Sequence, residues 1–566
     1  MTRTMFVCRR GRERLMLAFL LLAFVMAGPA FGASEARPQV RIQAGTLQGS
    51  FDASSKVTAY KGIPYAKAPI GELRWRPPVP APAWQGVKNA RKFGHSCLQP
   101  PYPPNSVYAG EMASPSEDCL TLNVWAPSGA RNLPVMVWIH GGALLRGGSS
   151  EPMYDGTKLA QQGIVVVSIN YRLGLLGFFA HPALSAESPQ GVSGNYGLLD
   201  QIEALRWVRD NIADLGGDPA QVTIAGESAG GLSVVALLAS PLAHGLYTKA
   251  IVQSAYIQSQ RALSDDVLGL RSAEAEGAAL AQAARALTAE DLRKADPVTL
   301  FKAGVASSWR PEPVIDGMVL KRQLAETFAR GEQAKVAVIA GFNEGEIRSL
   351  PYFMPPWPET RAAYEADVRR RFGDQAPAFL AVYPGTDPKA DVMASIRDGS
   401  CGWTAQSLAL RQAQAGQLAY LYYFRHSTPA QRERDLAAFH ASELPYFFGQ
   451  VGPSAVLGPN WPRPPLTRAE SQLSEAMMSY WVTFVRSGTP TAPGAPDWPR
   501  YTAEDRGYLD IDEQPSAARD LQTEEFALAD KLIETRRRQG RGWRLDIGFS
   551  AFSVDAPASG GQPLTP

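Results

Sequence analysis

The sequence predicts an α/β fold, with a mostly parallel central sheet, helices on both of its faces and helical cap insertions. Short apolar runs such as 133–139 (LPVMVWI) and 164–169 (IVVVSI) are typical of strands buried on both faces. These runs alternate with helical stretches, which is the pattern of parallel strands joined by crossover helices. Of the 566 residues, 45% are hydrophobic and 19% are charged. This composition is typical of a globular protein with a large core.

The expected elements follow one another from residue 133 to residue 424. A helix is predicted over 198–215, because apolar residues recur there at steps of three and four until Gly216-Gly217 ends the stripe. A second, buried helix is predicted over 229–239. The predicted strands are 133–139, 164–169, 221–225, 249–253, 335–340 and 418–424.

Two long segments interrupt this alternation, about 258–330 and about 350–415. Both are helical and irregular in character, and we predict that they cover the carboxyl edge of the sheet, where open α/β sheets bind their ligands. We therefore expect one domain over 33–552 that contains both cap insertions, followed by a flexible tail over 553–566.

The first 32 residues have the features of an export signal. A basic region containing five arginines precedes the apolar run Leu15–Ala27, and Gly28, Pro29 and small residues follow. The apolar run is short for a bilayer span, so we expect cleavage after Gly32 and a periplasmic or secreted protein. An uncleaved membrane anchor is the alternative. No other stretch of the sequence is long and apolar enough to span a membrane.

The charge of the expected mature chain does not favour nucleic acid or an anionic membrane surface as a partner. Loss of residues 1–32 changes the net charge from +2 to about −2. A nearly neutral chain without a basic stripe gives no argument for binding nucleic acid or an anionic membrane surface. We therefore expect no stable membrane association after signal cleavage. The sequence does not specify the oligomeric state.

Three cysteines remain after the expected cleavage, since Cys8 leaves with the signal. Cys97 and Cys119 flank a proline-rich segment, and in an oxidising compartment we expect them to form a disulfide. Closing a loop of this size restricts the unfolded chain by roughly 3 kcal/mol. Cys401 has no partner and no activating neighbour in the sequence, so we expect a buried, inert thiol.

A candidate nucleophile lies in the pentapeptide 226–230 (GESAG), between a predicted strand and a predicted helix. In a G-x-S-x-G turn, small neighbours allow a strained backbone that exposes the serine hydroxyl at the edge of the sheet. The following helix directs its N-terminal dipole at the site and favours developing negative charge. The pentapeptide alone is equally compatible with a plain loop, but its position between strand and helix favours Ser228 as the nucleophile.

A candidate oxyanion hole lies upstream, at His140-Gly141-Gly142-Ala143, directly after the strand that ends at Ile139. This is the expected place of an HGGG-type loop. Small residues let backbone N–H groups approach a substrate oxygen, and each donor contributes about 3 kcal/mol to transition-state stabilisation. We expect the donors to be the N–H groups of Gly142, Ala143 and Ala229. An ordinary glycine-rich turn is the alternative.

Longer motifs point to one family. Five segments occur around these two loops: 60–66 (YKGIPYA), 73–78 (LRWRPP), 116–125 (SEDCLTLNVW), 195–201 (NYGLLDQ) and 216–219 (GGDP). They resemble those of the type-B carboxylesterases, a family that includes cholinesterases and bacterial para-nitrobenzyl esterases. The resemblance extends over about residues 38–512. It implies an α/β-hydrolase fold and the hydrolysis of carboxylic esters.

His440 is the expected general base among the six histidines. It lies late in the chain, where an α/β-hydrolase has its base after the acid. Its segment 439–446 (FHASELPY) resembles the H-x-x-E-L-x-Y motif of the family. We expect His440 to take the proton of the serine and to deliver it to the leaving alcohol. Glu443, in the same segment, is expected to be a structural partner.

The acid of the triad is expected between the nucleophile and the base. The segment 341–346 (GFNEGE) follows a predicted strand and resembles the family motif G-x-N-x-D-E-G, which assigns the acid to Glu346. The sequence departs from that motif, because Gly345 replaces the usual aspartate and Ile347 the usual glycine. This departure leaves Glu344 as an alternative acid.

Together these motifs predict a serine carboxylic-ester hydrolase that forms an acyl-enzyme and acts on small-molecule esters. The sequence has no metal-binding H-E-x-x-H, no phosphate-binding loop and no dinucleotide fingerprint, so we expect no metal and no cofactor. Two alternatives remain open. One is an acyltransferase or amidase that uses the same triad. The other is an inactive hydrolase fold that serves as a binding module.

The sequence offers only weak indications of substrate. Leu144 and Leu145 follow the glycine-rich loop and favour an aliphatic wall. Trp309, Trp357 and Trp403 lie in the expected caps, where they are candidates either for lining an apolar gorge or for the core.

Overall fold

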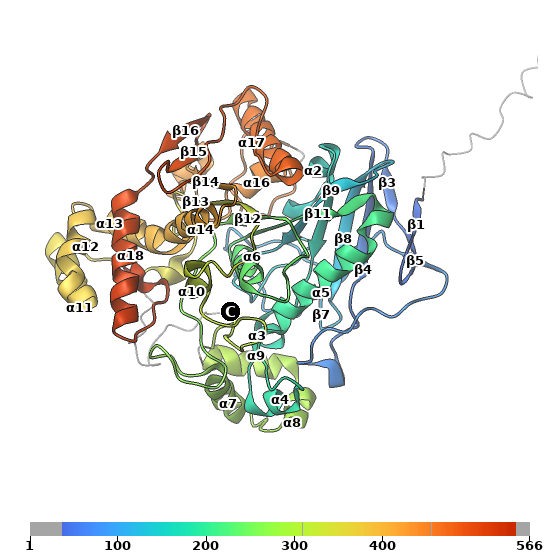
Figure 1. Cartoon of the computed structure of the whole chain (residues 1–566), viewed down its shortest axis with the longest axis horizontal. Helices are drawn as coiled ribbons and strands as arrows, with labels where there is room; N and C mark the ends of the chain where they lie inside the picture. The colour runs from blue at the N-terminus through green and yellow to red at the C-terminus, as the bar shows by residue number, and fades with distance from the viewer. Residues whose placement is uncertain (1–36, 308, 454, 551–566) are drawn as a thin grey trace, which may run out of the picture.

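The computed structural model describes residues 37–550 except 308 and 454. The expected signal (1–32) and tail (553–566) lie outside the described residues. An 11-stranded sheet forms the centre of the molecule (Figure 1). In spatial order its strands are β16 (Pro515–Arg519), β15 (Gly507–Ile511), β14 (Ala419–Phe424), β13 (Ala337–Asn343), β12 (Lys249–Gln253), β11 (Gly217–Glu227), β9 (Leu133–Ile139), β10 (Val165–Ile169), β8 (Thr121–Pro127), β4 (Val57–Pro64) and β3 (Ser50–Asp52).

The middle of the sheet is parallel, as the sequence predicts. All neighbouring strands from β10 to β15 run in the same direction. The strands at the two edges are antiparallel, with β8, β4 and β3 beyond β10 and with β16 beyond β15. None of these edge strands was predicted from the sequence. The carboxyl ends of the parallel strands lie at one edge of the sheet, where α/β folds hold their functional residues.

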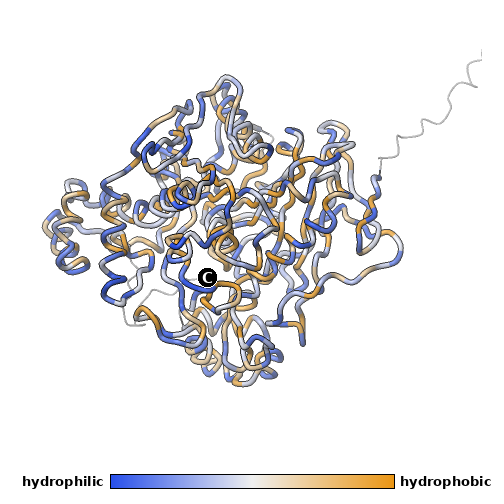
Figure 2. Tube along the Cα trace, viewed as in Figure 1, coloured by the Kyte–Doolittle hydropathy of each residue, from blue (hydrophilic) through white to orange (hydrophobic). Residues whose placement is uncertain are grey.

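Helices cover both faces of the sheet and create two separate cores. Alternate side chains of β9 point to opposite faces. Val135 and Val137 pack in a core with α5 (Tyr196–Asn211), α6 (Ala229–Ala239) and α14 (Trp403–Gln414). Met136 and Trp138 pack in the other core with α2 (Thr157–Gln161), α16 (Leu444–Phe447) and α17 (Arg468–Ser487). Figure 2 shows the hydrophobic segments concentrated around the central strands and α6.

The predicted helix over 198–215 is divided between two elements. The α-helix α5 ends at Asn211, and a 3-10 turn over Ile212–Leu215 completes the segment. Gly216 then adopts a left-handed conformation with φ of 89°, which suits a residue without a side chain.

The two segments expected to form caps contain most of the peripheral helices. The first contains α7 (Ala273–Ala283), α8 (Ala289–Lys294), α9 (Pro297–Ala306) and α10 (Leu324–Ala329), and the second contains α11 (Arg361–Phe372), α12 (Ala376–Val382), α13 (Pro388–Arg397) and α14. Figure 1 shows α7, α8 and α9 gathered beside α4 (Pro182–Glu187), and α11, α12 and α13 gathered on another side of the molecule. Because α14 packs on β13 and β14, the second segment ends on the face of the sheet.

The remaining elements are small or peripheral. They are α3 (Gly174–Phe178), α15 (Pro429–Glu433), α18 (Thr523–Arg538), a sheet of β1 (Gln39–Ile42), β2 (Gly45–Gln48) and β5 (Val87–Asn89), and a pair formed by β6 (Ser96–Cys97) and β7 (Pro115–Ser116). None of the helices between residues 37 and 550 that the structure describes is long and apolar enough for a membrane span.

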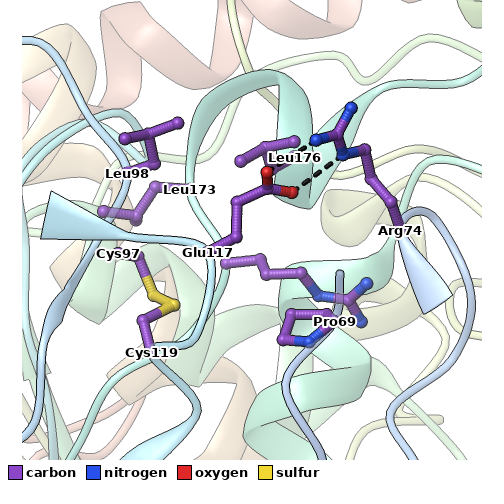
Figure 3. A pocket seen from close by; sticks show the side chains of 9 residues that line it. Pro69, Arg74, Cys97, Leu98, Glu117, Cys119, Leu173 and Leu176 are labelled. Carbon is purple, nitrogen blue, oxygen red and sulfur yellow. Dashed lines mark hydrogen bonds and ion pairs between the residues drawn. A yellow bond between two sulfur atoms is a disulfide. The ribbon is translucent and has the colours of Figure 1, made fainter. Parts of the chain in front are cut away.

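A disulfide between Cys97 and Cys119 closes the loop between β6 and β8, with a Cα–Cα distance of 4.9 Å. Figure 3 shows this disulfide at a small cavity, beside an ion pair between Arg74 and Glu117. The guanidinium donates from Nη2 to Oε1 at 2.6 Å and from Nε to Oε2 at 2.8 Å. The cavity is separate from Ser228, which is not among its lining residues. Cys401 is buried, and burial raises the pKa of its thiol well above the usual value.

The double substitution Cys97→Ala/Cys119→Ala is expected to lower the free energy of unfolding by about 3 kcal/mol, because the unfolded chain regains the freedom of the closed loop. Denaturant unfolding of the two proteins without reductant measures the difference. Parent protein treated with reductant serves as the control and should unfold with the variant. Equal midpoints for the oxidised parent and the variant would contradict the expectation.

Candidate active site

Ser228 lies at a strained turn between β11 and α6. Its φ of 58° and ψ of −122° are unusual for a residue with a side chain, and such strain is typical of functional turns. The glycines around it are required by close packing. A Cβ atom on Gly230 would lie 2.0 Å from the carbonyl oxygen of Ile139, and one on Gly226 would lie 2.5 Å from the carbonyl carbon of Gly230. Ser228 itself is partly exposed, whereas Glu227 and Ala229 on either side are buried.

The loop after β9 passes directly beside this serine. A Cβ atom on Gly141 would lie 3.1 Å from the Cβ atom of Ser228. Gly142 and Ala143 both have positive φ angles, of 98° and 58°. Within the described part of the chain, neither of their N–H groups has an intramolecular acceptor. The N–H of Ala229 belongs to the first turn of α6, where N–H groups have no partner within the helix. The three expected donors therefore remain available to a ligand.

His140 supports this loop. Its Nδ1 is 2.9 Å from the carbonyl oxygen of Gly141, and its ring stacks on Tyr171 at 4.6 Å between centres. The hydroxyl of Tyr171 donates to the carbonyl oxygen of His140 at 3.0 Å. Burial lowers the pKa of His140 to about 4, so this imidazole is neutral at ordinary pH.

Glu346 and His440 are in direct contact. The Nδ1 atom of His440 donates to Oε2 of Glu346. The other carboxylate oxygen, Oε1, accepts a hydrogen bond of 2.8 Å from the backbone N–H of Asn343. Both side chains are buried, which strengthens the interaction. Glu344, the alternative acid, is exposed and has no contact with His440. The geometry therefore favours Glu346.

The departure of this segment from the family motif has a steric cause. The N–H of Gly345 donates to the carbonyl oxygen of Ala438 at 2.8 Å. A Cβ atom on Gly345 would lie 2.6 Å from the carbonyl oxygen of Leu436. The segment that leads to His440 thus packs so closely against Gly345 that an aspartate does not fit at this position. Ile347, which replaces the usual glycine, is buried.

Glu227 is a site residue that the sequence analysis did not identify. Its Oε1 lies 3.2 Å from Nε2 of His440. In the described structure the hydroxyl of Ser228 makes no hydrogen bond to His440, so Glu227 is the residue that faces Nε2. Burial raises the pKa of Glu227 to about 8. Only its place inside the G-x-S-x-G motif indicated that it lies near the nucleophile.

Glu443 is a structural partner of Asn343 and Gln253, close to His440 in the sequence. Its carboxylate accepts hydrogen bonds from Nδ2 of Asn343 at 2.6 Å and from Nε2 of Gln253 at 3.0 Å. Burial raises the pKa of Glu443 to about 6. Asn343 also donates from Nδ2 to the carbonyl oxygen of Phe439. These contacts join the end of β13 to the segment that carries His440.

The pKa of His440 reflects two opposing influences. Burial lowers it, whereas the negative charges of Glu227 and Glu346 raise it, and together they bring it to about 9. A protonated His440 cannot act as a base, so the activity should fall as the pH decreases through this pKa. The carboxylate that faces Nε2 therefore moves the acid limb of the pH profile toward higher pH.

The substitution Glu227→Gln is expected to move the acid limb of kcat/KM by about one pH unit toward lower pH, because it removes a negative charge beside Nε2. A pH–rate profile from pH 5 to pH 10 (roughly the range in which His and buried Glu titrate) measures the shift. Glu344→Gln, which changes an exposed carboxylate nearby, is the control and should leave the limb unchanged. A limb that stays in place in Glu227→Gln would contradict the expectation.

A tyrosine contacts the segment that carries His440. The hydroxyl of Tyr108 donates to the carbonyl oxygen of His440 at 2.9 Å and is 2.7 Å from Oγ of Ser349. Burial raises the pKa of Tyr102, Tyr108 and Tyr352, and the charge of Glu227 raises it further. These tyrosines are in long connecting segments, and no motif in the sequence indicated them.

The three tryptophans of the expected caps differ in burial, and Trp309 is half-buried against the core. Trp403 is buried against Trp543, with its Nε1 donating to Asp530 at 2.8 Å. Trp357 is 39% exposed, beside Lys389. Of the two leucines after the glycine-rich loop, Leu145 is half-buried and Leu144 is fully packed in the core. Within the described part of the chain, no three His, Cys, Asp or Glu side chains are arranged to hold a metal ion.

A mostly parallel sheet that carries a serine at a strained strand-to-helix turn, followed along the chain by a buried glutamate and a histidine in contact with it, defines an α/β-hydrolase. The chain belongs to the carboxylesterase family, which it matches over residues 36–529. This confirms the predicted family and fold class. The protein is a carboxylic-ester hydrolase that acts on small ester substrates.

Known relatives cover almost the whole chain. The chain is 37% identical to fumonisin B1 esterase of Sphingopyxis macrogoltabida, over 82% of this chain and 85% of that protein. It is 34% identical to para-nitrobenzyl esterase of Bacillus subtilis (strain 168), over 86% of this chain and 97% of that protein. The crystal structure of a Geobacillus stearothermophilus carboxylesterase superposes with a TM-score of 0.73, at 33% identity, over 87% of this chain and 99% of that one.

Proposed function

We propose that Ser228, His440 and Glu346 form the catalytic triad of this esterase and that the reaction passes through an acyl-enzyme. The observation that carries the proposal is the buried contact between His440 Nδ1 and Glu346, beside the strained turn of Ser228. In a triad the carboxylate fixes the tautomer of the imidazole, so that Nε2 is free to accept a proton, and it stabilises the imidazolium that forms.

The reaction has two halves. The Oγ atom of Ser228 attacks the ester carbonyl while its proton passes to Nε2 of His440, and the carbonyl oxygen becomes an oxyanion. The N–H groups of Gly142, Ala143 and Ala229 donate to this oxyanion. Collapse of the intermediate expels the alcohol, which takes the proton from His440, and leaves Ser228 acylated. Water, deprotonated by His440, then releases the acid and restores the serine.

One movement precedes the attack. In the described structure Nε2 of His440 faces Glu227, so the hydroxyl of Ser228 must rotate toward Nε2 when the substrate binds. Catalytic hydrogen bonds often tighten only in the complex with substrate. Burial raises the pKa of Glu227 to about 8 and the positive charge of His440 opposes this rise, so the two groups titrate as a coupled pair.

Covalent labelling tests the proposal. A fluorophosphonate should stop the hydrolysis of p-nitrophenyl esters and add its mass to the peptide that contains Ser228, because only an activated serine reacts. A series of p-nitrophenyl esters of increasing acyl length, measured in parallel, gives the length of acyl chain that the site accepts. Inhibition with the label on another residue, or turnover that survives complete labelling of Ser228, would refute this assignment.

We also propose that the protein is exported and that its mature domain, 33–552, carries its caps at about 258–330 and 350–415. Formation of the disulfide between Cys97 and Cys119 requires an oxidising compartment, which supports export. The N-terminal residue of the exported protein tests the signal. Ala33 is expected, whereas a chain that retains the apolar run 15–27 would favour the membrane-anchor alternative.

A further inference from the structure

The last described segment of the chain, 542–550, is buried although it is irregular. It follows α18, and its only regular element is a 3-10 turn over Leu545–Ile547. Every residue of the segment except Arg544 and Leu545 is buried. Irregular backbone normally lies at the surface, because its polar groups need partners. Here the two cap segments supply those partners, and we call 542–550 the C-terminal strap.

The beginning of the strap is bonded to the first cap. The backbone N–H of Trp543 donates to Oγ of Ser259 at 3.0 Å, and the backbone N–H of Ser259 donates to the carbonyl oxygen of Trp543 at 2.8 Å. The guanidinium of Arg544 forms an ion pair with the buried Glu312, in which Nη1 donates to Oε2 and Nη2 donates to Oε1 at 3.3 Å. Side-chain and main-chain contacts thus hold this end of the strap.

The end of the strap is bonded to the second cap. The backbone N–H of Phe549 donates at 3.0 Å to Oγ of Ser395 on α13. The ring of Phe549 is fully buried, stacks on Tyr364 of α11 at 5.5 Å between centres, and lies 4.5 Å from the guanidinium carbon of Arg371. A Cβ atom on Gly548 would lie 2.1 Å from the carbonyl oxygen of Ser395, so the strap and α13 are in close contact. The strap therefore joins two insertions that are distant in the sequence.

The last residue of the strap reaches the chain beside the proposed base. The hydroxyl of Ser550 donates to the carbonyl oxygen of Phe353 at 3.2 Å. Phe353 lies in the stretch that follows the proposed acid along the chain. Earlier in this stretch, Oγ of Ser349 is 2.7 Å from the hydroxyl of Tyr108, which donates to the carbonyl oxygen of His440 at 2.9 Å.

The first cap contacts the oxyanion loop. A Cβ atom on Gly174 would lie 2.8 Å from the ring of Phe301 on α9 and 3.4 Å from Cδ1 of Leu145. The backbone N–H of Leu145 donates to the carbonyl oxygen of Gly142 at 3.0 Å. The strap is therefore connected to the oxyanion loop through the first cap, and to the segment beside the proposed base through Phe353.

We propose that the C-terminal strap fixes the two caps relative to each other and thereby limits the size of the acyl group that reaches Ser228. The proposal rests on the proposed function. A bulky ester requires the caps to separate, so its apparent affinity is reduced by the fraction of molecules in which they are apart. A small ester does not require this separation. A tether that is bonded at both ends keeps the separated fraction low, and release of either end raises it.

Two p-nitrophenyl esters with the same leaving group test the proposal, the acetate and the 4-phenylbutanoate. The readout is the ratio of kcat/KM for the 4-phenylbutanoate to kcat/KM for the acetate, in which a loss of active enzyme cancels. Ser259→Ala/Arg544→Gln loosens the end on the first cap, and Phe549→Ala loosens the end on the second. Glu312 keeps Nε of Arg261 as a partner at 2.8 Å, so the first variant leaves no unpaired carboxylate.

Each of these strap variants should raise the ratio by about tenfold, the lower end of what the shape of a pocket contributes to discrimination. The variant that combines all three substitutions should stay within about twofold of either one, because a tether released at one end no longer restrains the caps and the two changes are not additive. If Phe549→Ala does not fold, Ser395→Ala takes its place, since it removes only the acceptor of the Phe549 N–H.

Two controls separate the strap from stability in general. Phe484→Ala removes another fully buried ring, which packs edge-on against Tyr420 outside both caps. Arg425→Gln removes an ion pair of 2.7 Å with Asp510, also outside the caps. Both controls should keep the ratio of the parent, although Phe484→Ala lowers the free energy of unfolding by about 3–5 kcal/mol.

The proposal is overturned if the ratio stays the same or falls in the strap variants, if the two increases multiply in the combined variant, or if Phe484→Ala raises the ratio equally. An equal fall of both rates in the strap variants leaves the ratio unchanged and would assign the strap a structural role alone. Failure of the proposed function gives a different result, because the parent would then continue to hydrolyse the acetate after complete labelling of Ser228 by a fluorophosphonate.

Discussion

Replacement of Ser228 by alanine is expected to reduce kcat for a p-nitrophenyl ester by about a million-fold, to the level that the oxyanion donors and substrate binding alone provide. Alanine has the same backbone constraints as serine at this turn and lacks only the hydroxyl. The substitution therefore removes the nucleophile and leaves the close contacts of Gly226, Gly230 and Gly141 intact. Turnover by the purified variant at substrate saturation measures the loss.

Ser233→Ala is the matched control for this experiment. Ser233 lies on α6, the helix that follows Ser228, is fully buried, and donates its hydroxyl proton to the carbonyl oxygen of Ala229 at 2.9 Å. Its loss should change kcat by less than about tenfold, since one buried hydrogen bond contributes roughly 1 kcal/mol. Turnover in Ser228→Ala within tenfold of the parent, in a preparation free of parent enzyme, would exclude Ser228 as the nucleophile.

Glu346→Gln is expected to lower kcat by about ten-thousand-fold, although glutamine has nearly the same shape as glutamate. The backbone N–H of Asn343 still finds an amide oxygen to accept its hydrogen bond. Nδ1 of His440, in contrast, now faces a group that can donate a proton, so the wrong tautomer is stabilised and Nε2 carries the hydrogen. The imidazolium also loses its buried counterion. Steady-state kinetics on the alkaline side of the acid limb give the change in kcat.

The exposed neighbour Glu344 provides the comparison. Glu344→Gln should retain the kcat of the parent within about twofold, because surface charge changes have small effects. A large loss in Glu344→Gln together with a small loss in Glu346→Gln would reverse the assignment and make Glu344 the acid. The two variants thus distinguish between the two acids that the sequence allowed.

The sequence predicted the centre of the fold better than its edges, because burial on both faces leaves a clear pattern. Strand 133–139 is a continuous apolar run since its side chains enter two cores, and the structure has the same limits for β9. Near one edge of the sheet, β15 alternates between buried and half-buried residues, and most of the edge strand β16 is exposed. Neither forms an apolar run, so neither was predicted.

The end of β13 shows how packing between strands overrides a local signal. The predicted strand ended at residue 340, before Gly341, but β13 continues to Asn343. The glycine does not end the strand, because the ring of Tyr422 on the neighbouring β14 covers it, 2.1 Å from where a Cβ atom would lie. The longer strand brings Asn343 into contact with Glu443.

The candidate site was predictable where a residue type is tied to a local motif, as for Ser228, Gly142 and His440. It was not predictable where the role depends on contacts between distant segments. The carboxyl group of Glu227 is buried because the loop at Gly141 passes over it, with Oε2 3.0 Å from where a Cβ atom would lie.

The loop closed by Cys97 and Cys119 carries Tyr108, which holds the main chain at His440. The same crosslink that resists unfolding thus secures one support of the proposed base. A chain that folds in a reducing compartment keeps every residue of its triad, yet this support then lies on an untethered loop. Oxidation of the two thiols therefore tethers the loop from which Tyr108 contacts the main chain of His440.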